Sequence, residues 1–183
     1  MKPTTVRTAD PDRDAAACLA IYAPYVESGA TSFEQEPPGP VEFAERIGAT
    51  AARYPWLVAE HEGDVVGYAY ACPHRSRPAY RWAVEVSVYV AAERWRRGCG
   101  RALYAELIER LRGQGFHVAC AGITLPNEAS IALHESVGFV SVGVYRRIGW
   151  KDGAWRDVGW WQLELAAPGE GRPAEPLPPE PES

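Results

Sequence analysis

Apolar residues recur along this chain with two periods, one typical of helices and the other of strands. A helical period follows Asp10 and Pro11, since aspartate caps helices and proline starts them. We expect Pro24 to kink or split this helix before Gly29 ends it. Further helices are predicted after Pro40, after the glycine loop at 98–100, and over 127–137. Strands are predicted at 4–8, 56–60, 65–72, 81–90, 117–124, 139–150 and 155–165.

The order of these elements predicts the fold class. Hairpin turns are expected at Glu62-Gly63-Asp64 and at Asp152-Gly153. The order β-α-α-β-β-β-α-β-α-β-β is typical of a mixed α/β sheet with helices on its faces. We therefore expect one domain over 1–165. Residues 166–183 include six prolines and four glutamates, and this Pro/Glu-rich tail is predicted to be disordered.

Composition and charge exclude several classes of protein. No apolar run approaches the roughly 20 residues of a membrane span, and no signal peptide is recognised, so we expect no membrane partner and a cytoplasmic location. The four cysteines form no CxxC pair and, in a reducing compartment, are expected to be small buried hydrophobic residues. The net charge of −5, without a broad basic stripe, argues against a nucleic-acid partner.

Four arginines gather around a glycine loop, Arg94-Trp95-Arg96-Arg97-Gly98-Cys99-Gly100-Arg101, between a predicted strand and a predicted helix. Glycines let backbone N–H groups approach a diphosphate, and both the helix N-terminus and the arginines favour anions. A tight turn with solvated arginines is the alternative. Neither GxxxxGK[ST] nor GxGxxG fits, so the loop indicates neither a nucleoside triphosphate nor a dinucleotide.

The strand at 81–90 carries a single acidic residue. Alternation places Glu85, Ser87 and Tyr89 on one face and valines on the other. A strand this apolar is expected in the middle of the sheet, covered on both sides. A buried carboxylate takes up a proton more readily than an exposed one, so Glu85 is a candidate general base. The alternative is a Glu85 that is solvated or paired with an arginine.

The remaining polar residues give weaker signals. The four histidines lack zinc-like spacing, so no metal site is predicted, and a helical histidine such as His134 is more often structural than catalytic. No GxSxG motif occurs, and nothing indicates covalent catalysis. Arg75 and Arg77 precede the 81–90 strand and could converge on one carboxylate, although a solvated loop is the alternative.

Taken together, these motifs resemble the GNAT superfamily of N-acetyltransferases. The strand–RxGxG–helix unit resembles its acetyl-CoA pyrophosphate loop. Asn127, Ser130, His134-Glu135 and Gly138-Phe139 resemble its C-terminal N…(Y/H)E…GF motif. More narrowly, the chain is similar to phosphinothricin and methionine sulfoximine acetyltransferases at 53–60, 77–82, 85–90, 114–116 and 155–163. The resemblance covers about residues 4–165.

The resemblance implies a GNAT-type central mixed β-sheet flanked by helices, acetyl-CoA as co-substrate, and acetylation of the α-amine of a small amino-acid-like molecule. It implies Glu85 as general base, with His134 or Tyr89 as proton donor to the thiolate. The implied coenzyme-binding residues are Val88, Tyr89, Val90, Trp95, Arg96, Arg97, Gly98, Cys99, Gly100, Arg101, Asn127 and Ser130. The implied substrate-binding residues are Phe33, Arg75, Arg77, Tyr80, Tyr89 and His134. Dimeric relatives imply a homodimer.

The chain departs from the family pattern at two places. Trp95 stands where Gln or Arg is usual, so Arg94 or Arg96 is expected to compensate. His74 and Pro78 flank the loop arginines, which leaves phosphinothricin, methionine sulfoximine and methionine sulfone all open as substrates. Two other functions also stay open: a non-catalytic sensor of acyl-CoA or amino acids, and a protein N-terminal acetyltransferase.

Overall fold

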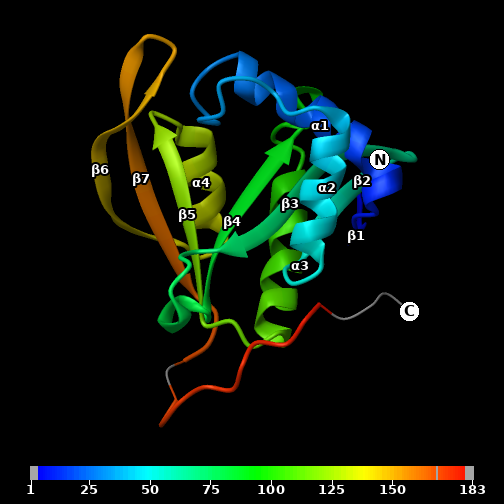
Figure 1. Ribbon diagram of the computed structural model, residues 1–183. Helices are drawn as coiled ribbons and strands as arrows, with labels where there is room; N and C mark the ends of the chain where they lie inside the picture. The colour runs from blue at the N-terminus through cyan, green and yellow to red at the C-terminus, as the bar shows by residue number, and fades with distance from the viewer. Residues whose placement is uncertain (1–3, 168, 180–183) are drawn as a thin grey trace.

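The structure, a computed structural model, describes residues 4–167 and 169–179. Within these ranges the strands form one sheet in the order β1-β2-β3-β4-β5-β7-β6 (Figure 1). The strands are β1 Thr5–Thr8, β2 Trp56–His61, β3 Asp64–Pro73, β4 Ala83–Val90, β5 Val118–Leu125, β6 Val140–Lys151 and β7 Ala154–Glu164. The helices are α1 Pro11–Glu27, α2 Pro40–Ala51, α3 Cys99–Gly113 and α4 Glu128–Ser136, with short 3-10 turns η1 Pro78–Tyr80 and η2 Ala92–Arg94. In the same ranges, no helix is both long enough and apolar enough to cross a membrane.

The helices lie on both faces of the sheet, as the mixed α/β prediction requires. α1 and α2 cover one face, and α3 and α4 cover the other (Figure 1). Alternation along the strands supplies both cores: Trp56 and Val58 of β2 pack with α1 and α2, whereas Leu57 and Ala59 pack with α3. The central strands are therefore apolar on both sides, and their sequences read as nearly continuous hydrophobic runs.

The prediction that Pro24 splits the first helix is wrong. α1 runs without interruption from Pro11 to Glu27, with Pro24 in its last turn. A proline lacks the N–H that would bond one turn back, but only three helical residues follow it. The N–H of Ser28 bonds to the carbonyl of Pro24 at 2.9 Å and closes the helix end. The cost of the proline is therefore confined to the terminus.

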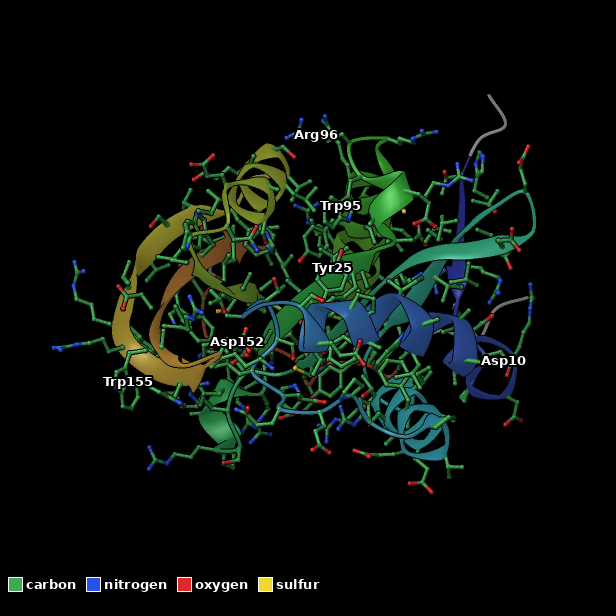
Figure 2. All side chains as sticks on the ribbon, turned by 90° about the horizontal axis from the view of Figure 1, so that it is seen from above. Asp10, Tyr25, Trp95, Arg96, Asp152 and Trp155 are labelled. Atoms are coloured by element: carbon green, nitrogen blue, oxygen red, sulfur yellow. The ribbon has the colours of Figure 1, made fainter. Side chains whose placement is uncertain are left out.

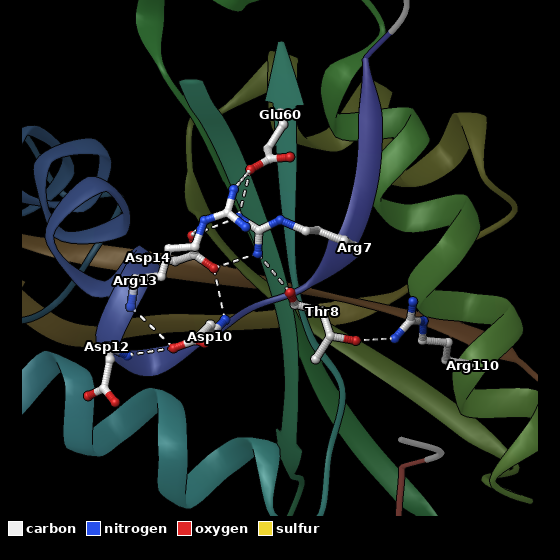
Figure 3. Close-up of polar contacts among 8 residues, drawn as sticks. All are labelled: Arg7, Thr8, Asp10, Asp12, Arg13, Asp14, Glu60 and Arg110. Carbon is white, nitrogen blue, oxygen red and sulfur yellow. Dashed lines mark hydrogen bonds and ion pairs between the residues drawn. The ribbon is translucent and has the colours of Figure 1, made fainter. Parts of the chain in front are cut away.

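An ion-pair network fastens the start of α1 to the sheet edge (Figure 3). Arg7 of β1 donates two hydrogen bonds to the Asp14 carboxylate, at 2.6 and 2.7 Å, and a third to Glu60 at 2.7 Å. Burial acts to raise the pKa of Asp14. The hydrogen bonds from Arg7 and the Asp10 amide, with the charges of Arg7 and Arg13, outweigh it and hold that pKa below its usual value.

The chain after Leu165 forms no helix or strand in its described residues, and it returns along the foot of the sheet (Figure 1). The Arg81 guanidinium bonds to both carboxylate oxygens of Glu175 at 2.8 Å. The indole N–H of Trp82 bonds to the carbonyl of Ala174 at 2.7 Å. These contacts join the tail to the residues immediately before β4.

Candidate active site

β4 and β5 are neighbours in the sheet, yet they pair over only three residues each. Ala83–Glu85 pair with Val118–Cys120 in parallel. Beyond Glu85, β4 continues along β3 to Val90, and β5 continues along β7 to Leu125. The two strands therefore part towards their C-terminal ends, and Glu85 stands at the last paired position. The opening presents backbone groups of β4 that a ligand can pair with.

A groove of about 630 Å³ lies at this opening, between the end of β4, the glycine loop and the start of α4. Its lining includes ten of the residues predicted to bind the coenzyme: Val88, Val90, Trp95, Arg96, Gly98, Cys99, Gly100, Arg101, Asn127 and Ser130. Tyr89 and Arg97, also predicted, are not among the lining residues. The structure thus brings together segments that lie almost 40 residues apart in the sequence.

The glycine loop gives the groove an anion-binding end. Gly98 is the N-cap of α3, and its φ of +82° is the left-handed conformation that glycine adopts most easily. Among the described residues no side chain caps the helix, and its first N–H groups remain available to an anionic ligand. A Cβ on Gly100 would stand 2.9 Å from the Leu133 side chain, and glycine there lets α3 and α4 approach closely. Arg94, Arg96 and Arg101 add positive charge around it.

Trp95 has a different role from the arginine or glutamine expected there. Its indole N–H donates to the Val90 carbonyl at 2.9 Å, and the Tyr25 hydroxyl donates to the same oxygen at 2.6 Å. Figure 2 shows Tyr25 and Trp95 close together, with Arg96 at the outer rim. The Val90 carbonyl therefore already accepts two hydrogen bonds. Trp95 therefore fixes the loop against β4, and Arg94 and Arg96 lie beside it in the lining of the groove.

Glu85 is half-buried, and its carboxylate contacts His74 and Arg75. Its side chain is 29% exposed, so the prediction of full cover on both sides is wrong at this residue. The reason is that the strand ladder opens beside it. His74 Nδ1 and Arg75 Nη1 each lie 3.0 Å from Glu85 Oε1, and the Arg75 guanidinium sits 5.9 Å from the centre of the Trp160 ring. The alternative of an arginine-paired Glu85 is the one found.

Two thiols flank this carboxylate across the sheet. Cys72 of β3 and Cys120 of β5 are both in register with Glu85. Burial raises the pKa of the Cys72 thiol to about 11, and the charge of Glu85 adds to the effect. Burial likewise raises the pKa of Cys120. Both thiols are therefore protonated near neutrality and are weak nucleophiles. In the described ranges, no group of three or more His, Cys, Asp or Glu could hold a metal ion.

His134 is buried, at 4% exposure, and both of its ring nitrogens have partners. Nδ1 lies 2.7 Å from the Ser130 carbonyl, which can only accept, so Nδ1 carries the proton. Nε2 lies 2.8 Å from the Tyr104 hydroxyl and accepts from it when the ring is neutral. Burial lowers the pKa of His134, against an opposing effect of the Ser130 hydrogen bond. The neutral ring thus links α3 to α4.

The other residues predicted to bind substrate lie on three segments. Arg77 and Tyr80 are exposed on the turn before β4, with the Tyr80 ring 5.8 Å from that of His74. Tyr89 packs edge-on against Tyr25 and a second α1 tyrosine, and burial raises its pKa well above the usual value. Phe33 lies in the loop between α1 and α2, with its ring against the backbone of Gly149 in β6.

Sequence reasoning missed three aromatic residues of this region. Trp160 stands 5.9 Å from the Arg75 guanidinium and 6.0 Å from the His74 ring. Tyr25 and Tyr104 fix Trp95 and His134 respectively. Tyr25 could have been found from its place in the last turn of a helix that also carries Tyr22. Trp160 carried no signal, because its neighbours come from segments far away in the chain.

Comparison with known proteins extends this geometry. Residues 7–160 match the family model described as an acetyltransferase (GNAT) domain. The chain is 42% identical to the phosphinothricin N-acetyltransferase of Streptomyces viridochromogenes, covering 96% of both chains. It is 39% identical to the L-methionine sulfoximine/L-methionine sulfone acetyltransferase of Salmonella typhimurium, covering 88% of this chain and 94% of the relative.

Among solved structures, it resembles a phosphinothricin acetyltransferase from Sinorhizobium meliloti in complex with acetyl-CoA. The TM-score is 0.89, with 36% identity over 95% of each chain. The family model, the relatives and the solved structure all indicate the same family. The chain belongs to the GNAT acetyltransferase family.

Proposed function

We propose that this protein transfers the acetyl group of acetyl-CoA to the α-amine of a small amino-acid-like molecule of the phosphinothricin, methionine sulfoximine or methionine sulfone type. The observation that carries the proposal is the position of Glu85 at the point where β4 and β5 part. The anion-binding groove begins at the same opening. A coenzyme whose diphosphate lies at the glycine loop would then place its thioester between the two strands, next to an amine at Glu85.

Glu85 can act as the base once its partner Arg75 binds the substrate instead. The α-carboxylate of the substrate competes with Glu85 for Arg75, which holds Glu85 through one nitrogen and is 46% exposed. Once Arg75 binds the substrate, Glu85 takes the proton of the incoming ammonium, directly or through water. Acetyl-CoA supplies the thioester: the amine nitrogen bonds to its acetyl carbon, and the C–S bond breaks.

The departing sulfur needs a proton donor, and we assign this role to Tyr89 rather than His134. The protonated Nδ1 of His134 already donates to the Ser130 carbonyl, and Nε2 faces the Tyr104 hydroxyl. Tyr89 belongs to the same strand face as Glu85, and its raised pKa keeps the hydroxyl protonated. The attacking nitrogen loses two protons in all: the first goes to Glu85, and the second replaces the proton that Tyr89 gives to the sulfur. Arg77, Tyr80 and Phe33 are proposed to bind the rest of the amino acid.

A thiol-release assay tests the proposal. Acetyl-CoA is mixed with the protein and with phosphinothricin, methionine sulfoximine, methionine sulfone or a short peptide with a free α-amine, each alone. We expect rapid thiol release with at least one free amino acid and little with the peptide. Release with the peptide alone would favour a protein N-terminal acetyltransferase. Acetyl-CoA binding without release in any mixture would favour a sensor.

We further propose a homodimer that works in the cytoplasm and detoxifies such amino-acid analogues. Support for the dimer is the exposed apolar row Val140, Val142 and Val144 on the edge strand β6. Support for the cytoplasm is that Cys18, Cys72, Cys99 and Cys120 are all free thiols. Light scattering should give twice the chain mass of 20.1 kDa, and cell fractionation should find the protein with cytoplasmic markers.

A further inference from the structure

The loop that carries Phe33, residues 28–39, is fastened at several points. Ser32 is buried and its hydroxyl lies 2.7 Å from the Tyr22 hydroxyl of α1. The Glu34 carboxylate pairs with Arg46 of α2. Both contacts tie the loop to its own two helices. Neither contact connects the loop to the β6–β7 hairpin, which lies on the β5 side of the opening between β4 and β5.

Lys151, the last residue of β6, makes that connection. Its side chain is only 3% exposed, and its ammonium donates to the Val26 carbonyl at 2.8 Å and to the Glu34 carbonyl. Val26 lies in the last turn of α1, and this last turn contains no basic residue. A cation there is favourable, because helix C-termini carry partial negative charge. A buried ammonium is costly unless such acceptors surround it, so its position is well determined.

Gly149, two residues before Lys151, receives the Phe33 ring. A Cβ built on Gly149 would overlap ring atoms of Phe33, so the ring lies directly on the β6 backbone. Lys151 holds the carbonyl of Glu34, the residue after Phe33. Figure 2 shows the tip of this hairpin, marked by Asp152, beside the loop that follows α1. One strand end therefore holds both the ring of Phe33 and the backbone of the residue that follows it.

We propose that Lys151 is a positioning residue that sets the affinity for the amino-acid substrate by holding Phe33 in place. The inference rests on the proposed function, which puts Phe33 in the amino-acid pocket. If Lys151 had only a structural role, its substitution would lower stability and would not change the KM of one substrate more than that of the other. A positioning lysine changes the KM for the amino acid and spares the KM for acetyl-CoA, whose groove it does not line.

The test compares Lys151→Met with Arg146→Met, which removes an exposed cation from the same strand. We expect Lys151→Met to raise the KM for phosphinothricin or methionine sulfoximine about tenfold, because the loop must then be ordered on binding. The KM for acetyl-CoA should change less than about twofold, within the scatter of distant substitutions. Arg146→Met should leave both unchanged. A rise of both KM values in parallel, or of neither, would overturn the proposal.

A double-mutant cycle with Phe33→Ala then asks whether Lys151 acts through Phe33. The effects of Phe33→Ala and Lys151→Met on the amino-acid KM should be clearly less than additive. Full additivity would overturn the proposal. Amide hydrogen exchange over residues 28–39 tests, without turnover, whether Lys151 holds this loop. Exchange should be faster in Lys151→Met than in the wild type and unchanged in Arg146→Met. If the wild-type protein acetylates no amino acid, the proposed function is wrong. If hydrogen exchange over 28–39 is the same in Lys151→Met as in the wild type, the proposal that Lys151 holds the loop is wrong.

Discussion

Two arginine–carboxylate pairs in this molecule differ in geometry and in burial. Arg7 holds Asp14 through two nitrogens, at 2.6 and 2.7 Å, and Asp14 is 1% exposed (Figure 3). Arg75 holds Glu85 through one nitrogen at 3.0 Å, and both side chains keep substantial contact with solvent. The first pair also receives the Asp10 amide at 2.8 Å. The second faces an opening between strands.

The difference shows that the burial of an arginine–carboxylate pair decides whether the pair stays closed or can open to another partner. Breaking the Arg7–Asp14 pair would leave the buried Asp14 carboxylate without its main cationic partner, so the pair persists in the native state. The Arg75–Glu85 pair loses little when it opens, because water and an incoming zwitterion can satisfy both ends. We therefore expect substitutions in the first pair to change stability and substitutions in the second to change catalysis.

The largest expected effect is on turnover at the open pair. Glu85→Gln removes the proton acceptor and should lower kcat by about 10²–10⁴-fold, the usual contribution of general base catalysis. Steady-state kinetics with the best amino acid from the panel measures this. Glu109→Gln, an exposed change on α3, serves as the control and should leave kcat as it is. Wild-type turnover in Glu85→Gln would remove Glu85 from the role.

At the closed pair the expected effect is on stability. Arg7→Met should lower the free energy of unfolding by about 3–5 kcal/mol, because Asp14 stays buried without its main partner. Arg13→Met, which removes a 60% exposed neighbour of the same network, should cost less than about 1 kcal/mol. Urea denaturation compares the two. Similar losses in both variants would mean that burial does not distinguish these arginines.

A smaller effect is expected on substrate affinity. Arg75→Ala combined with Arg77→Ala should raise the KM for the amino acid by about 10–100-fold, the range for a lost charge-assisted hydrogen bond. The KM for acetyl-CoA should be unaffected, since neither arginine lines the coenzyme groove. Initial rates at varied concentrations of each substrate separate the two constants. Equal weakening of both would contradict the assignment of these arginines to the amino acid.

The smallest effect concerns acid stability. The pKa of Asp14 is lower in the folded protein than its unfolded value of about 3.9. The stabilisation is therefore complete above that value and is lost as the pH falls through the folded pKa. Between pH 5 and pH 3, the free energy of unfolding should fall more steeply in the wild type than in Asp14→Asn. Denaturant titrations across this range measure both slopes, and parallel slopes would argue against the linkage.

Local signals in the sequence predicted much of this molecule. The Asp10 cap, the Asp152-Gly153 turn and the glycine loop each depend on neighbouring residues, and their helices and strands lie within two residues of the expected bounds. The opening beside Glu85 could not be predicted, because it depends on which strands pair over which residues. Lys151 was missed for the same reason, since its acceptors lie more than 100 residues earlier.

The contacts of the carboxyl-terminal tail bear on how relatives of different length can be compared. Arg81 and Trp82 bind Glu175 and Ala174, and they directly follow the turn that carries Tyr80. A chain ending at Leu165 would lose both contacts and expose these two side chains further to water, while Arg81 would keep its hydrogen bond to the Pro78 carbonyl at 2.7 Å. Swapping tails between homologous proteins would therefore change the surroundings of the segment that links the Tyr80 turn to β4, without changing Tyr80 itself.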